Sequence, residues 1–159
     1  AMVGAAEKGA ALIAEMQAKV EAVRAKTSQW TVRPKVYFEE WDEPPISAIQ
    51  WVSELIGIAG GDDCFPELAK QSLGKNRIIA NSNEIVRRNP DIIIGSWCGK
   101  KFRPETVAAR AGWGNVLAVK HQQIFEIKSP LILQPGPAAL TDGLDALHSL
   151  MVQWQTVRN

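Results

Sequence analysis

The chain has 159 residues, which is the size of one domain with a single core. Its 18 basic and 17 acidic side chains nearly balance, so it lacks the overall field that would attract a nucleic-acid backbone or an anionic membrane. No apolar run reaches membrane-spanning length, and the first thirty residues lack the pattern of a secretory signal. The two cysteines, Cys64 and Cys98, fall in no Cys-x-x-Cys or Cys/His spacing, so the sequence indicates neither a metal site nor a disulfide framework.

The first predicted element is one long amphipathic helix over residues 3–27. Apolar residues recur in it at helical spacing: Leu12, Ile13, Met16, Val20 and Val23. A helix of this length exceeds what is needed to cover one small sheet, so we expect part of its apolar stripe to face something outside this chain. Residues 30–34 follow as a linker, because Pro34 prevents the helix from continuing.

Residues 35–40 are typical of a first strand, and residues 41–45 of a loop at its carboxyl end. Helical spacing of apolar residues predicts a helix from Ile46 to Ala59, and Gly60-Gly61 supplies a left-handed cap. Residues 62–79 are the least patterned part of the chain.

The stretch from Asn89 to Gly99 predicts a buried strand that ends in a site. Ser82 is the expected N-cap of a short helix leading to it. Three consecutive isoleucines, Ile92–Ile94, cannot alternate between core and solvent, so both faces of the strand must be covered, as in a central parallel strand. Ligands of open α/β sheets bind at the carboxyl ends of such strands, which makes Ser96, Trp97 and Cys98 the first candidates.

Pro104 opens another short helix that ends by Gly112. Residues 115–120 and 123–127 are predicted as the third and fourth strands, joined by a tight turn, and Gly136-Pro137 opens a last helix with one apolar stripe. Strands alternating with helices predict an α/β fold: a three-layer lobe with a mostly parallel central sheet wrapped by helices, preceded by one long helix.

Cys98 admits several interpretations. Trp97-Cys98-Gly99 lacks the second thiol of a redox turn. Only three residues separate Gly95 from Gly99, and Lys101 occupies the position where a phosphate-binding loop has Ser or Thr, so this motif does not fit either. A hydrolytic cysteine would need His121 or His148 beside it. The alternative is that Cys98 is a small apolar plug.

Two further clusters have both a functional and a structural interpretation. Four acids, Glu39, Glu40, Asp42 and Glu43, form a loop that either supplies acid and base groups or is simply solvated. Trp41 and Trp97 either share one rim, as a surface for a large flat ligand, or pack under loops. The remaining candidates are expected to be structural: Lys100, Lys101 and Arg103 as a solvated face, and Trp113 in the core.

Four segments together carry a family resemblance. They are Pro34–Trp41, Trp51–Leu55 with Ala59-Gly60-Gly61, Asn89–Ile93, and Ser129-Pro130. The chain resembles the carboxyl-terminal lobe of a class III periplasmic substrate-binding protein of ABC importers, of the cobalamin- and ferric-siderophore-receptor type. The similarity covers nearly the whole chain.

The resemblance implies two α/β lobes joined by one long helix, with the ligand held in the cleft between them. Residues 1–29 would then be the connecting helix and residues 30–159 one ligand-binding lobe, with the amino-terminal lobe absent. The implied function is that of a solute-binding component, not an enzyme, which delivers a cobalamin-like or iron-chelate (siderophore or haem) ligand to a membrane permease. Such a protein is periplasmic or extracellular, and a membrane anchor in the full-length protein is an open alternative.

By the same resemblance, six residues would line this lobe's half of the cleft: Glu40, Trp41, Trp97, Cys98, Gln123 and Ser129. Glu84, in a Ser-x-Glu helix start, matches the position of a surface glutamate that docks on arginines of the permease; the alternative is an ordinary helix-dipole partner. Two other functions remain open: a thiol- or carboxylate-dependent enzyme at Cys98 or Glu40, and a module that self-associates into a homodimer through its exposed helix stripe.

Overall fold

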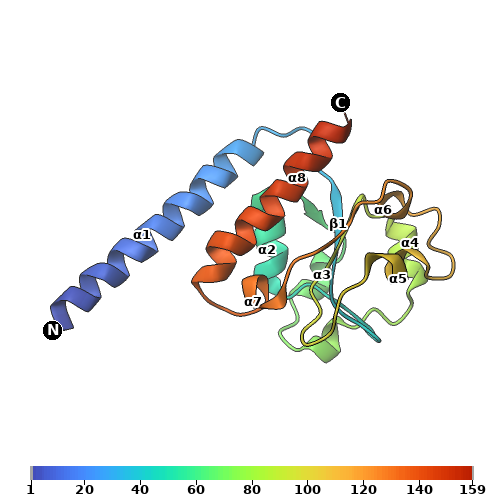
Figure 1. Cartoon of the computed structure of the whole chain (residues 1–159), viewed down its shortest axis with the longest axis horizontal. Coiled ribbons are helices and arrows are strands. Elements are labelled where there is room, and N and C mark those ends of the chain that lie inside the picture. Colours follow the sequence, from blue (N-terminus) through green and yellow to red (C-terminus); the bar gives the residue numbers. More distant parts are fainter. Residues whose placement is uncertain (1, 159) are drawn as a thin grey trace.

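A computed structural model describes residues 2–158 of the chain, and Figure 1 traces them from the blue amino end to the red carboxyl end. In chain order the elements are α1 (Met2–Thr27), β1 (Lys35–Asp42), β2 (Pro45–Ser47), α2 (Gln50–Ala59), β3 (Asp62–Asp63), α3 (Pro66–Ala69), η1 (Gly74–Arg77), α4 (Asn83–Arg88), β4 (Ile92–Gly95), α5 (Pro104–Ala108), α6 (Leu117–Lys120), β5 (Ile124–Glu126), α7 (Ser129–Ile132), η2 (Ala139–Gly143) and α8 (Leu144–Arg158). Among these described residues, no helix combines the length and the apolar character needed to cross a membrane.

The strands form one five-stranded sheet in the order β2-β1-β4-β5, with β3 also paired to β1. β1 runs parallel to β3 and β4, and β4 runs parallel to β5, whereas β2 pairs back on β1 antiparallel. The predicted α/β lobe, with a mostly parallel sheet and one long helix before it, is therefore confirmed. Parallel pairing places the carboxyl ends of β1, β4 and β5 at one edge of the sheet and their amino ends at the other.

β4 lies at the centre of the sheet, between two hydrophobic cores. Ile92, Ile93 and Ile94 are each 0% exposed. Ile92 and Ile94 pack with α2 and α8, whereas Ile93 packs on the opposite face with residues from α4, α5 and α6. Figure 1 shows α2, α7 and α8 on one side of the sheet and α4, α5 and α6 on the other. The isoleucine run predicted this strand correctly because only a strand covered on both faces can bury every side chain.

α1 rests on the lobe through its carboxyl half alone. Val23 and Thr27 are buried, and the Thr27 hydroxyl donates a 2.8 Å hydrogen bond to the Ile58 carbonyl. Residues 4–15 are all exposed, including Leu12 at 45% and Ile13 at 53%. Figure 1 shows this half of the helix projecting away from the other elements. Within the described residues, the apolar face of α1 thus continues past the part of the lobe that covers it.

The structure corrects the predicted loop over residues 41–45 and the start of the next helix. β1 continues to Asp42, Pro45–Ser47 return beside it as β2, and α2 begins at Gln50 rather than at Ile46. Pro45 is tolerated in a strand here because β2 is the outermost strand of the sheet. Its carbonyl still accepts a 2.8 Å hydrogen bond from the Ile79 N–H.

The predicted third strand is wrong, because residues 117–120 form the helical turn α6. Two hydrogen bonds hold this turn at the amino edge of the sheet: the Ala118 N–H donates to the Pro90 carbonyl, and the Leu117 N–H donates to Asn89 Oδ1. So short an apolar run cannot be assigned to helix or strand from its periodicity. β5 follows at Ile124–Glu126, inside the predicted fourth strand.

The helix ends predicted from the sequence are confirmed only in part. Gly60 adopts the expected left-handed conformation with φ 105°, where a Cβ would collide with the Trp30 ring. Ser82 does not cap α4, since its backbone is helical and Asn81 Oδ1 accepts the Asn83 N–H over 3.0 Å instead. The predicted stripe of the last helix is confirmed by burial of Leu144, Leu147 and Met151, although the helix is preceded by the π-helical turn η2.

The half-covered α1 leads to a prediction for amide hydrogen exchange. An isolated helical segment of about a dozen residues is only marginally stable in water, whereas one packed on a core shares the stability of the lobe. We therefore expect amides of residues 4–15 to exchange at least about a hundredfold faster than those of residues 20–27, measured by NMR or mass spectrometry. Uniform protection along α1 would show that the amino half is covered.

Candidate functional site

The carboxyl ends of β1 and β4 meet at one edge of the sheet. Glu39 lies opposite Gly95 in the register, and the Ser96 N–H donates a 2.9 Å hydrogen bond to the Glu39 carbonyl. Trp41 and Trp97, which follow these positions, therefore emerge at the same edge. A Cβ at Gly95 would collide with the Phe102 ring, so the chain beyond β4 folds back closely over the strand.

The Glu39 carboxylate is the hub of this edge. It is 0% exposed and accepts hydrogen bonds from both Arg110 Nη atoms at 2.8 Å, from the Tyr37 hydroxyl at 2.7 Å and from Trp97 Nε1 at 3.1 Å. A two-point guanidinium contact is the geometry that best compensates a buried carboxylate. Burial, followed by the charge of Glu39, raises the pKa of Tyr37 well above its ordinary value, so the phenol remains a donor.

Lys100 lies between the two indoles. Its Nζ is 5.6 Å from the centre of the Trp41 ring and 5.0 Å from that of Trp97, and it forms a 2.6 Å ion pair with Asp42. Cations at these distances from aromatic faces gain cation–π attraction. Trp41 is half-buried, but Trp97 is only 6% exposed and packs edge-on against Phe102. The two indoles are thus neighbours, and most of the aromatic surface left open belongs to Trp41.

Glu40 faces the other side of β1 and pairs with Arg77. Two hydrogen bonds of 2.8 and 2.9 Å join the carboxylate to Arg77 Nη2, and the arginine is 2% exposed. Arg77 also donates to the carbonyls of Ser47, Gln71 and Ser72. Burial raises the pKa of the Glu40 carboxyl, and the Arg77 charge opposes that shift. This pair fixes the loop before η1 to the end of β1.

The expectation of a solvated acidic loop is therefore wrong for three of its four members. Glu39, Glu40 and Asp42 each have a cationic partner, and Glu43 alone of the four is exposed. A carboxylate whose oxygens are held by arginine is poorly placed to exchange protons with a substrate. The geometry thus favours recognition over acid and base chemistry at this edge.

Cys98 is exposed, which corrects its interpretation as an apolar plug, whereas Cys64 is buried. Neither histidine serves it as a base. His121 precedes β5 at the amino edge, and His148 Nδ1 lies 3.0 Å from the carbonyl of Ala59, where α2 ends before the start of β3. The arrangement is that of a free surface thiol beside an aromatic and cationic edge.

Two predicted cleft residues lie in different places. Ser129 opens α7 just beyond the carboxyl end of β5 and is half-buried, so it belongs to the same edge as Trp41. Gln123 precedes β5, and its carbonyl accepts the Ile93 N–H at the amino end of the sheet. The structure therefore does not bring Gln123 together with the other five residues.

Glu84 lies in the first turn of α4, on the side of the sheet that α4, α5 and α6 cover. Its carboxylate accepts hydrogen bonds from Arg87 and from Arg88, and Arg88 also pairs with Glu67. The bonds from Arg87, then Arg88, lower the pKa of Glu84 to about 2. The side chain is thus ionised at physiological pH and already engaged within its own helix.

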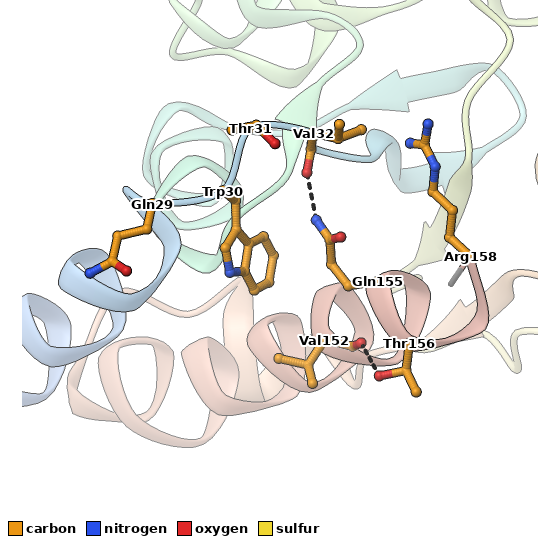
Figure 2. A pocket seen from close by; sticks show the side chains of 8 residues that line it. All are labelled: Gln29, Trp30, Thr31, Val32, Val152, Gln155, Thr156 and Arg158. Carbon is orange, nitrogen blue, oxygen red and sulfur yellow. Dashed lines mark hydrogen bonds between the residues drawn. The ribbon is translucent and has the colours of Figure 1, made fainter.

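Two surface hollows lie away from the carboxyl edge of the sheet. One of about 560 Å³, shown in Figure 2, separates the linker after α1 from the last turns of α8. Its dashed bonds run from Gln155 to the Val32 carbonyl and from Thr156 to the Val152 carbonyl, so these two polar groups are already satisfied. An apolar groove of about 480 Å³ runs between α1, α2 and residues 135–140. Over residues 2–158, no cluster of three His, Cys, Asp or Glu side chains could hold a metal ion.

Sequence reasoning missed the cations of this edge. Arg110 lies 71 residues from Glu39, and Arg77 lies 37 residues from Glu40, so no local pattern links the partners. Lys100 is predicted to lie on a solvated face; its side chain is 45% exposed, but it is also paired with Asp42. Its place two residues after Cys98, at the end of a buried strand, was the available signal.

The comparisons with known proteins agree with one another. The profile of the family described as "Periplasmic binding protein" matches residues 1–131. Among curated proteins, the chain is 24% identical over 153 residues to an uncharacterized ABC transporter substrate-binding lipoprotein, YvrC, of Bacillus subtilis (strain 168), an alignment that covers 91% of this chain and 44% of that protein.

Solved structures show a similar fold. A possible iron-binding (periplasmic solute-binding) protein from Staphylococcus epidermidis matches with a TM-score of 0.72 and 21% identity, over 91% of this chain and 55% of that one. The periplasmic vitamin B12 binding protein BtuF of Vibrio cholerae matches at 0.64 and 16%, over 87% and 51%. IsdE of S. aureus, complexed with heme, matches at 0.68 and 19%, over 88% and 55%. The chain spans about half the length of these relatives.

The Glu39 hub predicts a large effect of removing Arg110. Arg110→Ala leaves a buried charge without its main partner, and we expect it to lower the free energy of unfolding by about 3 kcal/mol in urea denaturation. The matched control Arg87→Ala, on an exposed ion pair, should change it by less than about 1 kcal/mol. Adding Glu39→Gln to Arg110→Ala should recover part of the loss, and equal effects of the two arginine variants would contradict the assignment.

The two thiols should react very differently. Burial raises the pKa of Cys64 to about 12, whereas Cys98 is exposed. At pH 8 only about 10⁻⁴ of Cys64 is thiolate, so a chromogenic disulfide reagent should titrate one thiol in the folded protein and the second only after unfolding. Cys98→Ser should abolish the fast reaction; a fast reaction that survives in this variant would disprove the assignment.

Proposed function

Since this chain belongs to the periplasmic binding protein family, we propose that it forms one lobe of the solute-binding component of an ABC-type importer. In this proposal the protein captures a cobalamin-like or iron-chelate ligand in a cleft between two lobes and passes it to a membrane permease, with no chemical step. The proteins of similar fold include a vitamin B12 binding protein and one complexed with heme, which supports that ligand class.

The exposed half of α1 is the observation that supports a second lobe. Residues 4–15 have an uncovered apolar face that continues into the groove lined by Met16, Trp51 and Leu140. A contiguous apolar surface of this kind favours a covering partner. A second α/β lobe joined through α1, as the connecting helix of residues 1–29, would cover it and complete the cleft beside residues 30–159. In its absence, a second copy of this chain would cover the same face.

The carboxyl edge of the sheet is the proposed ligand surface of this lobe. The observation that carries the proposal is the cluster of Trp41, Lys100 and Trp97, where aromatic faces and a partly exposed cation meet at the ends of parallel strands. Flat chelates and corrin-like rings stack on indoles, and Lys100 suits an anionic group of the ligand. We propose that Cys98, next to Trp97, and Ser129, just beyond the carboxyl end of β5, also face the ligand, and that Glu40 supports the cluster from the other face of β1.

Delivery to the permease is proposed to use the α4 surface. Glu84 is ionised and partly exposed there, so an arginine of a partner can compete with Arg87, which is the more exposed of its two present partners. We also propose a periplasmic or extracellular location, which the family and the description of the similar B. subtilis protein as a lipoprotein support.

Equilibrium dialysis tests the proposed ligand class. The chain is dialysed against cobalamin, haem and ferric siderophores, and bound ligand is measured by absorbance. We expect weak retention of one class, because one lobe covers only one face of the ligand. Lys100→Ala and Trp41→Ala should each weaken it about five- to tenfold, whereas Lys101→Ala, the adjacent exposed lysine, should not. Retention of none of these ligands, by this chain or by a chain completed with a second lobe, would exclude the proposed function.

A further inference from the structure

Gln123 carries an unsatisfied acceptor at the amino edge of the sheet. Its backbone is fixed on both sides, because its N–H donates to the Ala118 carbonyl at 2.7 Å and its carbonyl accepts the Ile93 N–H at 2.9 Å. The residue is 8% exposed, and its Nε2 donates to the His121 carbonyl, but Oε1 is buried without a partner among the described residues. A buried amide oxygen without a donor is unfavourable, so a rotation of the Gln123 side chain that brings Oε1 to a donor from outside the fold is favoured.

Gln123 lines a hollow of about 350 Å³ between α6, the start of β5 and the last turns of α8. Leu117, Trp154 and Val157 form its apolar wall, and Val157 is 70% exposed. The volume suits a small organic molecule, and an indole beside a leucine gives an apolar body a surface to pack on. The hollow lies at the opposite edge of the sheet from Trp41 and Lys100.

Two opposite charges also line this hollow. Asp91 Oδ2 accepts the Lys35 N–H at 2.8 Å, and the Arg158 guanidinium carbon lies 5.2 Å from the centre of the Trp154 ring. In the part of the chain that the structure describes, neither residue forms an ion pair. A carboxylate and a guanidinium that lack ion pairs within residues 2–158 and lie in one hollow are complementary to a ligand that carries both charges.

We propose that this hollow binds a small zwitterion with an apolar body, the chemistry of an α-amino acid with an apolar side chain. The ammonium group donates to Asp91 and, once the Gln123 side chain has turned toward the hollow, to the orphan Gln123 Oε1. The ligand carboxylate pairs with Arg158, and the ligand side chain packs on Trp154 and Leu117. This site is separate from the proposed solute cleft and does not depend on it.

Titration of the ¹⁵N-labelled chain with L-phenylalanine tests the site by NMR. We expect saturable shifts at residues 91, 117–123 and 154–158, with millimolar or tighter affinity, and none at residues 41 or 97–100. Phenethylamine lacks the carboxylate and 3-phenylpropionate lacks the ammonium group, so each should bind at least about fivefold more weakly. Equal binding of all three probes would reduce the hollow to an apolar slot, and absence of shifts would mean that Gln123 Oε1 is satisfied by water; either result overturns the proposal.

Variants separate the Gln123 and Arg158 contacts from effects on folding. Gln123→Met keeps the length of the side chain but removes the acceptor, and Arg158→Gln removes the guanidinium; each should weaken L-phenylalanine at least about fivefold. The control Gln122→Asn changes the exposed neighbour, whose left-handed φ of 54° asparagine tolerates, and should bind as the parent does. The dispersion of the NMR spectrum reports whether Gln123→Met folds. If Gln123→Met fails to fold, Arg158→Gln, which changes an exposed position, still tests the proposal. Unchanged affinity in Arg158→Gln would overturn it.

Discussion

The buried charge of Glu39 is the constraint on which the carboxyl edge of the sheet depends. A carboxylate that is 0% exposed at the end of β1 requires a cationic partner, and that partner comes from Arg110, beyond α5. Trp97 donates to the same carboxylate from the start of this excursion. The chain from residue 96 to residue 110 must therefore close back over the sheet, and this closure places Lys100 over the two indoles. One buried ion pair thus holds the segment that carries Trp97, Cys98 and Lys100 against the sheet.

The sequence predicted the parts of this fold that depend on composition over a few residues. Three isoleucines identified β4, and Gly60 identified the end of α2, because burial on two faces and a left-handed backbone each restrict the residue types strongly. Residues 117–120 and 45–47 were misassigned, since such short segments take their conformation from partners such as Pro90 and β1 rather than from their own pattern. The charged partners of Glu39 and Glu40 lie too far along the chain for spacing to indicate them.

The two edges of the sheet differ in how their charges are compensated. At the carboxyl edge, Glu39, Glu40 and Asp42 are all paired within the lobe, so an anionic ligand meets Lys100 only by competing with Asp42. At the amino edge, Asp91 forms no ion pair within the described residues, whereas buried oxygens without a partner occur at both edges: Gln123 Oε1 here, and Asp42 Oδ1 and Ser96 Oγ at the carboxyl edge. In parallel sheets the carboxyl edge is the usual place for ligands. Here the three carboxylates of that edge are paired with cations of the same lobe, which is consistent with the proposed sharing of a ligand with a second lobe.

The way α1 is held has a mechanical consequence. Its contact with the lobe is a short seat around Val23 and Thr27, steadied by the ion pair between Lys19 and Asp145, while residues 4–15 extend freely beyond it. At about 1.5 Å per residue this free arm is about 18 Å long, so a tilt of about 5° at the seat moves its tip by about 1.5 Å. A substitution at Val23 or Asp145 would therefore change the direction in which residues 4–15 project from the lobe.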